Sequence, residues 1–141
     1  MRPEPSPPGA EQSLAPRHRP NSRQRILVVD DDPDVRRVST AMLIYSGYHA
    51  DAAEDGAAAW DDLRMNNYDL VITDNNMPRM TGVELIEKLR DARMDLPVIL
   101  TTGASPDGEF SRRPWLQPNI VLRKPHNFNE LLVAVKGIAK E

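Results

Sequence analysis

Leu70-Val71-Ile72-Thr73-Asp74 decides the fold of this chain, because it is a short apolar run that ends in a carboxylate. A continuous apolar run of this length is typical of a strand buried on both faces of a parallel sheet. The pattern is repeated in Ile26-Leu27-Val28-Val29-Asp30-Asp31 and in Pro97-Val98-Ile99-Leu100-Thr101-Thr102. The three runs predict strands of one sheet, and polar residues follow each strand at once.

Helical patterns separate these strands. Asp32 and Pro33 are typical of the N-cap and the first position of a helix that ends near Gly47. The apolar residues that recur at helical spacing there are Val35, Val38 and Met42. The remaining predicted elements are a weaker strand over His49–Glu54, a fifth strand over Ile120–Leu122, and three helices, over Gly56–Asn66, after Thr81-Gly82 and after Asn127 or Asn129. Strands that alternate with helices predict an α/β protein built on a parallel sheet.

The stretch between Gly103 and Asn119 breaks this alternation, because it contains three prolines and no apolar periodicity. Each interior proline costs a helix about 3 kcal/mol. The fourth helix is therefore expected to be short or irregular, at most one turn around Gly108–Arg113. Trp115 is expected to cover the sheet where a regular helix is missing.

The composition fits a single domain and excludes several classes of site. The chain has 141 residues, a formal net charge of −3 and no cysteine. The lack of cysteine excludes disulfides, thiolate zinc sites, iron–sulfur clusters and a cysteine nucleophile. The net charge argues against a protein that coats DNA. No apolar run approaches the roughly 20 residues that a membrane span needs, and no secretory signal is present, so a cytoplasmic protein is expected.

The first residues differ from the rest of the chain. Residues 1–25 contain six of the 13 prolines and five arginines, against two glutamates and almost no bulky apolar side chain. Such a segment cannot bury enough surface to offset its ordering entropy. The sequence thus predicts a disordered Pro/Arg-rich tail over residues 1–24 and one folded domain over residues 25–141.

The predicted strand ends bring three carboxylates, Asp30, Asp31 and Asp74, to one edge of the sheet, where open parallel sheets bind their ligands. Packing like charges is costly unless a cation neutralises them, and Mg²⁺ selects carboxylate oxygens and water. Thr102 and Lys124 end two other strands and suit an anion bound to that metal. The sequence therefore predicts a site for a phosphoryl group that is bound to, or transferred onto, a carboxylate.

These residues resemble the receiver domain of two-component response regulators, the CheY-like type. The motifs are Ile26-Leu27-Val28-Val29-Asp30-Asp31, Asp69-Leu70-Val71-Ile72-Thr73-Asp74-Asn75-Asn76-Met77-Pro78 with Gly82, Pro97-Val98-Ile99-Leu100-Thr101-Thr102, and Lys124-Pro125. The resemblance covers about residues 24–140, in register throughout. It implies a flavodoxin-like, doubly wound sheet of five parallel strands in the order 2-1-3-4-5, with helices on both faces.

The resemblance also implies a Mg²⁺ site. Asp31 matches a direct ligand of the metal and Asp30 one that acts mainly through water. Asp74 shares the metal through its carboxylate, and Asn76 contributes its backbone carbonyl. The residues alone favour a helix cap, rather than a further ligand, at Asp32.

Asp74 takes the role of phosphoacceptor in this resemblance. Thr102 matches the hydroxyl that turns toward the phosphoryl group, and Lys124 matches the lysine that pairs with Asp74 before phosphorylation and with the phosphoryl oxygens after it. The Lys124-Pro125 bond is expected to be cis, as is typical of the family. The implied function is a signalling module that accepts a phosphoryl group from a histidine kinase or histidine phosphotransfer protein, with Mg²⁺ as cofactor. It acts only on its own phosphorylation state and switches a contact with an unidentified downstream protein.

The resemblance has departures, and two alternatives accompany it. Val121 stands where the family usually has an aromatic ring that moves with the threonine, so we expect the switch to be expressed by ordering of residues 104–119 on activation. One alternative is a pseudo-receiver, an interaction domain that phosphate does not control. The other is a metal-dependent hydrolase, and Asn76, where a second acid would stand, argues against it. Because the chain ends soon after the last predicted helix, we expect a stand-alone receiver without direct DNA binding or membrane contact; a piece of a larger protein is the other reading.

Overall fold

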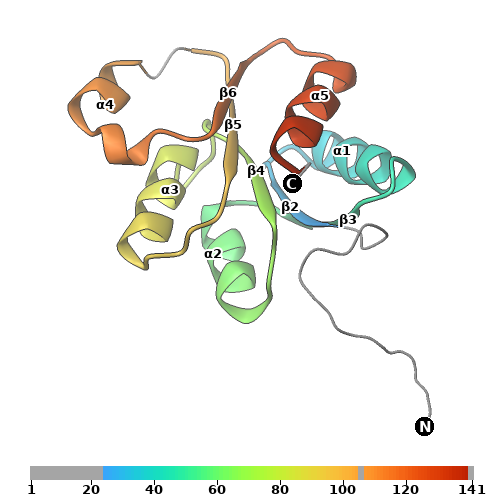
Figure 1. Cartoon of the computed structure of the whole chain (residues 1–141), viewed down its shortest axis with the longest axis horizontal. Coiled ribbons are helices and arrows are strands. Elements are labelled where there is room, and N and C mark those ends of the chain that lie inside the picture. Colours follow the sequence, from blue (N-terminus) through green and yellow to red (C-terminus); the bar gives the residue numbers. More distant parts are fainter. Residues whose placement is uncertain (1–23, 105–106, 140–141) are drawn as a thin grey trace, which may run out of the picture.

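The computed structural model describes residues 24–104 and 107–139, in which five strands form one parallel sheet. The strands are β2 (Arg25–Val29), β3 (His49–Ala53), β4 (Leu70–Asp74), β5 (Val98–Thr102) and β6 (Ile120–Arg123). Their spatial order is β3-β2-β4-β5-β6, which is 2-1-3-4-5 in chain order (Figure 1). The predicted doubly wound, flavodoxin-like sheet is confirmed.

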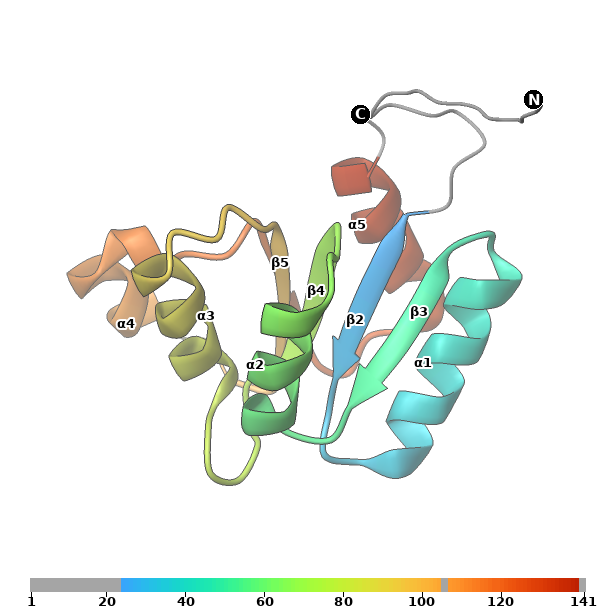
Figure 2. The ribbon, with the colours of Figure 1, turned by 90° about the horizontal axis from the view of Figure 1, so that it is seen from below.

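Helices cover both faces of this sheet. They are α1 (Pro33–Tyr45), α2 (Gly56–Met65), α3 (Gly82–Asp91), α4 (Asp107–Arg112) and α5 (Phe128–Ala139), and a 3₁₀ turn, η1 (Pro114–Leu116), follows α4. Helices α2 and α3 and the α4–η1 segment lie over one face, while α1 and α5 lie over the other (Figure 2).

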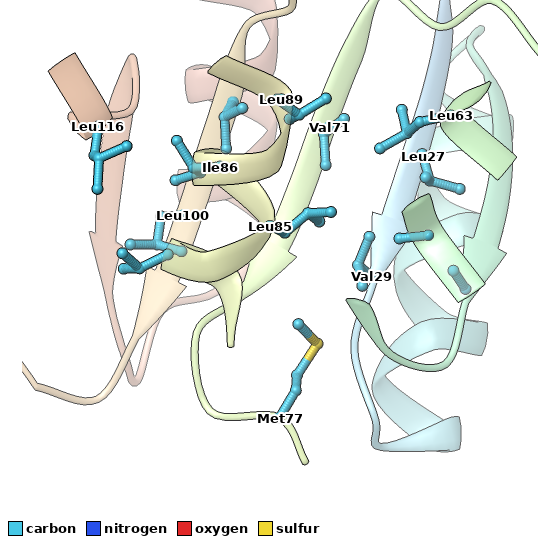
Figure 3. Packing of buried hydrophobic residues seen from close by; sticks show 14 of the residues in the cluster. Leu27, Val29, Leu63, Val71, Met77, Leu85, Ile86, Leu89, Leu100 and Leu116 are labelled. Carbon is cyan, nitrogen blue, oxygen red and sulfur yellow. The ribbon is translucent and has the colours of Figure 1, made fainter. Parts of the chain in front are cut away.

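Side chains alternate between the two faces, as the period of two in a strand requires. Leu27 and Val29 of β2 belong to the core under α2 and α3, whereas Ile26 and Val28 belong to the core under α1 and α5. Figure 3 shows the first core, in which α3 places its apolar side chains over the sheet. Burial of both faces explains why these strands carry uninterrupted apolar runs.

Caps fix the starts of the helices at the predicted residues. The Asp32 carboxylate accepts hydrogen bonds from the backbone N–H groups of Asp34 and Val35 at the start of α1. Thr81 forms a reciprocal capping box with Glu84 at the start of α3. Of the two candidates for α5, Asn127 is the cap, because its Oδ1 accepts the Glu130 N–H at 2.8 Å.

The apolar residues that recur at helical spacing in α1 are more exposed than that spacing suggests. Val35, Val38 and Met42 are 42%, 52% and 39% exposed, and Leu43 is the buried side chain of this helix. The helix faces the sheet with the side that carries Leu43 and the half-buried Ser39. Because α1 meets the sheet through this side, its apolar stripe stays largely exposed.

The stretch after β5 follows the prediction of a short fourth helix, since α4 has six residues. The prediction for Trp115 is wrong: its side chain is 60% exposed, and the neighbouring Leu116 is fully buried against α3 instead (Figure 3). Pro114 begins a tight 3₁₀ turn, and successive residues of such a turn point in different directions. That geometry gives the inward position to Leu116.

The predicted tail over residues 1–24 lies outside the described residues except for Gln24, as do residues 105–106 of the 104–119 segment and residues 140–141. Within the described ranges, no helix is long and apolar enough to cross a bilayer.

Candidate functional site

Three carboxylates meet at the carboxyl edge of the sheet. Asp30 and Asp31 follow β2, and Asp74 is the last residue of the adjacent β4. One oxygen from each residue can be chosen so that all lie within 4.8 Å of one another. The structure thus brings together the acidic residues that the sequence predicted, and their spacing suits ligands of a single cation.

Burial differs among these carboxylates. Asp30 and Asp74 are 6% and 4% exposed, whereas Asp31 is exposed. Burial raises the pKa of Asp30 above its usual value, and the nearby charges of Asp74 and Asp31 raise it further, against the opposing effects of the Asp32 N–H and Lys124. Holding such a group charged costs free energy that a cation would recover. Hard oxygen donors of this kind fit Mg²⁺.

Lys124 lies opposite the acidic cluster. It follows β6, and its Nζ donates to Oδ1 of Asp74 at 3.0 Å. The Lys124 N–H donates to the Thr102 carbonyl at 2.8 Å, which fixes the start of the loop after β6 on the end of β5. The Lys124-Pro125 peptide is cis, as predicted. One ammonium therefore reaches across β5 to the carboxylate at the centre of the site.

The loop between β4 and α3 is held close to Asp74. The Asn76 N–H donates to Asp74 Oδ1 at 3.3 Å. Asn75 was not predicted as a site residue, yet its side-chain Oδ1 accepts the Val83 N–H at 3.0 Å and its carbonyl accepts the N–H groups of Met77 and Gly82. The signal was present, because an asparagine directly after a strand, at the start of a loop, is a typical loop-fixing residue.

Gly82 permits the closest approach in the site. A Cβ at this position would lie 2.7 Å from the Asp74 carbonyl oxygen and 2.7 Å from Cδ1 of Leu100. Both distances are far inside van der Waals contact. The first turn of α3 therefore packs directly behind Asp74 only because residue 82 has no side chain.

Thr102 ends β5 and is buried. Its hydroxyl donates to the Ala104 carbonyl at 2.8 Å and accepts the Ala104 N–H at 3.2 Å. The hydroxyl is thus engaged by its own loop in this state. Val121 of β6 is half-buried and packs against the core under α3. Its side chain has no polar group that could form a hydrogen bond with Thr102.

A hollow of about 680 Å³ opens beside the acidic cluster, between α1 and α5. Asp30, Asp74 and Lys124 form its polar end, and apolar side chains of both helices, among them Val35 and Phe128, form the rest. Val35 and Val38 of the exposed stripe of α1 line this hollow. The site is therefore open on the side of α1.

A family model decides what this arrangement is, since the response regulator receiver domain matches residues 26–136. The chain belongs to this family. The receiver domain is part of a two-component system, and its sheet and strand-end motifs account for the geometry described above.

Curated relatives agree with this assignment. The receiver domain is 34% identical over 116 residues to the response regulator MprA of Mycobacterium sp. (strain KMS). This alignment covers 82% of the chain and 50% of MprA. It is also 39% identical over 100 residues to the sensor protein EvgS of Escherichia coli (strain K12). That alignment covers 71% of the chain and 8% of EvgS. The chain spans about half the length of the MprA proteins that it matches.

Solved structures show the same receiver fold. The response regulator TrrA from Thermotoga maritima, in complex with Mg²⁺-BeF, is 37% identical, with a TM-score of 0.73 over 82% of this chain and 98% of TrrA. The Francisella response regulator 1452 receiver domain is 26% identical, with a TM-score of 0.77 over 84% of this chain and 98% of that domain.

Proposed function

We propose that this receiver domain accepts a phosphoryl group on Asp74, with Mg²⁺ at the acidic cluster, from a phosphohistidine of a histidine kinase or a phosphotransfer protein. The observation that carries this proposal is the bond from Lys124 Nζ to Asp74 Oδ1, 3.0 Å long, next to the carboxylates of Asp30 and Asp31. A nucleophilic carboxylate, an acidic metal pocket and one fixed ammonium are the groups that phosphoryl transfer requires.

The transfer itself needs little covalent chemistry from the protein. An Asp74 carboxylate oxygen attacks phosphorus in line with the phosphohistidine nitrogen, so that an acyl-phosphate P–O bond forms while the P–N bond breaks. The leaving imidazole takes up a proton. Mg²⁺ bound by Asp30, Asp31, Asp74 and the Asn76 carbonyl would neutralise the charge of these carboxylates and of the phosphoryl oxygens.

Lys124 and Thr102 act after the transfer. The ammonium that pairs with Asp74 in this structure is placed to pair with a phosphoryl oxygen on the same carboxylate. Thr102 would exchange its hydrogen bond to the Ala104 carbonyl for one to the phosphoryl group. That exchange connects the chemistry at Asp74 with the segment that leads into α4, where we place the contact with a downstream protein.

The wider role follows from the relatives. TrrA was solved with Mg²⁺ and a beryllofluoride group, and EvgS is a sensor protein, which together support Mg²⁺-dependent phosphorylation and a kinase partner for this chain. The domain would act on its own phosphorylation state and on no separate substrate. We expect a donor side chain to reach Asp74 through the hollow between α1 and α5.

The test is intact-mass spectrometry after incubation with a small acyl-phosphate donor and Mg²⁺. The wild-type chain is expected to gain one hydroxylamine-labile phosphoryl group, and Asp74→Asn none, because an amide is a poor nucleophile. Asp32→Asn is the matched control, since asparagine keeps the cap of α1 next to the site. A phosphorylated Asp74→Asn chain would overturn the assignment, and a wild-type chain that gains no phosphate would favour a pseudo-receiver.

A further inference from the structure

A buried carboxylate outside the acidic cluster connects two loops of the site. Asp55 precedes α2 at the same edge of the sheet, and its side chain is 6% exposed. Its Oδ1 accepts the Ala58 N–H at 2.9 Å, as the cap of α2. Its Oδ2 accepts a short hydrogen bond from the Arg79 guanidinium, which comes from the loop between β4 and α3. These two partners lower the pKa of Asp55, so the carboxylate is charged and fully engaged.

Arg79 is held in a backbone conformation that an arginine rarely adopts. Its φ is 68°, in the left-handed region, and the Met80 N–H donates to the Pro78 carbonyl at 2.7 Å across it. A three-residue turn with positive φ at its centre is a rare and strained form. Such a conformation costs free energy and persists only where surrounding contacts hold it. The ion pair with Asp55 is such a contact.

The same loop presses on the first turn of α2. A Cβ at Gly56 would lie 2.7 Å from Cβ of Met80 and 2.9 Å from its Sδ, so no other residue fits without moving the loop. Asp55 and Gly56 thus form a seat for Arg79 and Met80. The seat receives one end of the loop, while the other end carries Asn76 and its hydrogen bond to Asp74.

Only Met77 and Pro78 separate the seated residues from Asn76, and the proline ring fixes one of the backbone dihedrals between them. The Met77 N–H also donates to the Asn75 carbonyl at 3.1 Å, which tightens the chain around Asn76. This short and restricted connection couples the position of Arg79 to that of Asn76.

We propose that the Asp55–Arg79 ion pair is a positioning device for Mg²⁺: it seats the loop between β4 and α3 on α2 and so aims the Asn76 carbonyl at the acidic cluster. This inference rests on the proposed function, because it assigns the pair a role in the metal site. Asp55 and Arg79 are positioning residues that act through Asn76, and neither needs to touch the metal.

The two possible effects of removing Arg79 change the Mg²⁺ affinity in opposite directions. Arg79→Gln removes a positive charge, so Coulomb's law alone makes Mg²⁺ bind more tightly to the variant. Loss of positioning makes it bind more weakly, and we expect a dissociation constant about tenfold higher, as for other groups that orient a metal ligand. Arg79→Lys should recover part of the affinity. Asp55→Asn, which keeps the cap of α2, should weaken binding like Arg79→Gln.

The control is Arg64→Gln, which makes the same change of charge at an exposed ion pair with Asp61 in α2. Its Mg²⁺ affinity should equal or slightly exceed that of the wild type. Binding is followed by amide NMR during titration with MgCl₂, and urea unfolding reports that each variant is folded. A readout without metal accompanies it, because the Asn76 and Met77 amides of Arg79→Gln should exchange with solvent faster than in the wild type.

The outcomes separate this inference from the proposed function. If the wild type binds Mg²⁺ and Arg79→Gln binds it equally or more tightly, the positioning role is wrong while the metal site stands. If Asn76 and Met77 exchange at the wild-type rate in Arg79→Gln, the pair does not hold the loop. If the wild-type chain binds no Mg²⁺, the metal site fails and this inference fails with it.

Discussion

Two connections lead from neighbouring strands into neighbouring helices on the same face of the sheet, and they are fixed by different forces. The connection from β4 to α3 is tied by hydrogen bonds, with Asn75 bonded to the start of α3 and the capping box of Thr81 and Glu84 at the helix start. It ends in a helix of 10 residues, of which five are buried. This connection carries Asp74 and Asn76.

Apolar side chains anchor the segment after β5. Helix α4 has six residues, and Phe110 and Leu116 connect the segment to the core under α3. Two polar contacts with α3 accompany them, 3.2 Å from Arg90 Nε to the Trp115 carbonyl and 3.3 Å from Arg113 to Glu87. Non-directional contacts fix a position less sharply than hydrogen bonds do.

The contrast separates two tasks within one domain. The proposed phosphoryl transfer needs groups held within a fraction of an ångström, and we expect the connection from β4 to α3 to supply that. A switch needs a segment whose arrangement can change at a modest cost in free energy, and elements with few buried contacts are the ones that open first. The predictions below test this division.

The largest effect is expected at the apolar anchor of the second segment. Leu116→Ala should lower the free energy of unfolding by about 2–5 kcal/mol, because a fully buried leucine loses its contacts and leaves a cavity. Trp115→Ala, one residue earlier and mostly exposed, should cost less than about 1 kcal/mol. Urea unfolding of the two variants measures the difference. Equal losses would mean that Leu116 does not anchor the segment.

A smaller difference is expected between the two helices in hydrogen exchange. Amides of α4 and η1, such as that of Leu116, should be protected at least about tenfold less than that of Leu85 in α3, a gap of about 1.4 kcal/mol. Addition of Mg²⁺ and beryllofluoride should raise protection in α4 and η1 and leave α3 unchanged. If α4 is already protected as well as α3, the proposed ordering of this region on activation is wrong.

The smallest effect concerns acid. Because the folded-state pKa of Asp55 is lowered, its carboxylate stabilises the fold above the unfolded-state pKa of about 4, and this contribution is lost as the pH falls through the folded-state value. The wild type should therefore lose more stability than Asp55→Asn between pH 5 and pH 2, by less than about 1 kcal/mol, as the cap remains. Urea midpoints measured across this range provide the check. Parallel pH profiles would contradict the prediction.

The sheet and the acidic cluster were accessible from the sequence because both depend on local patterns. Apolar runs mark the strands, and parallel strands bring their carboxyl ends to one edge, so Asp30, Asp31 and Asp74 had to meet there. The pairing of Lys124 with Asp74 came from the family resemblance, since the two residues are 50 positions apart.

The rest depended on contacts that no local pattern encodes. The seat for Arg79 joins residues 24 positions apart, and Asp55 alone predicts only a helix cap. The choice of Leu116 over Trp115 depends on the direction of a 3₁₀ turn between prolines, and hydrophobicity alone favours the larger ring. The exposure of Val35 and Val38 depends on how α1 meets the sheet, which helical spacing leaves open.

The absent side chain at residue 82 has a consequence for mutational tolerance. In a library in which every position is randomised and selected for signalling, Gly82 should be as intolerant as Asp74, although it has no chemical group to contribute. Even alanine would have to displace the backbone that carries Asp74, the proposed nucleophile. Loss of signalling in a genetic screen therefore does not by itself identify a residue that reacts. In this chain, one of the most constrained positions is expected to be Gly82, which contributes only the lack of a side chain behind Asp74.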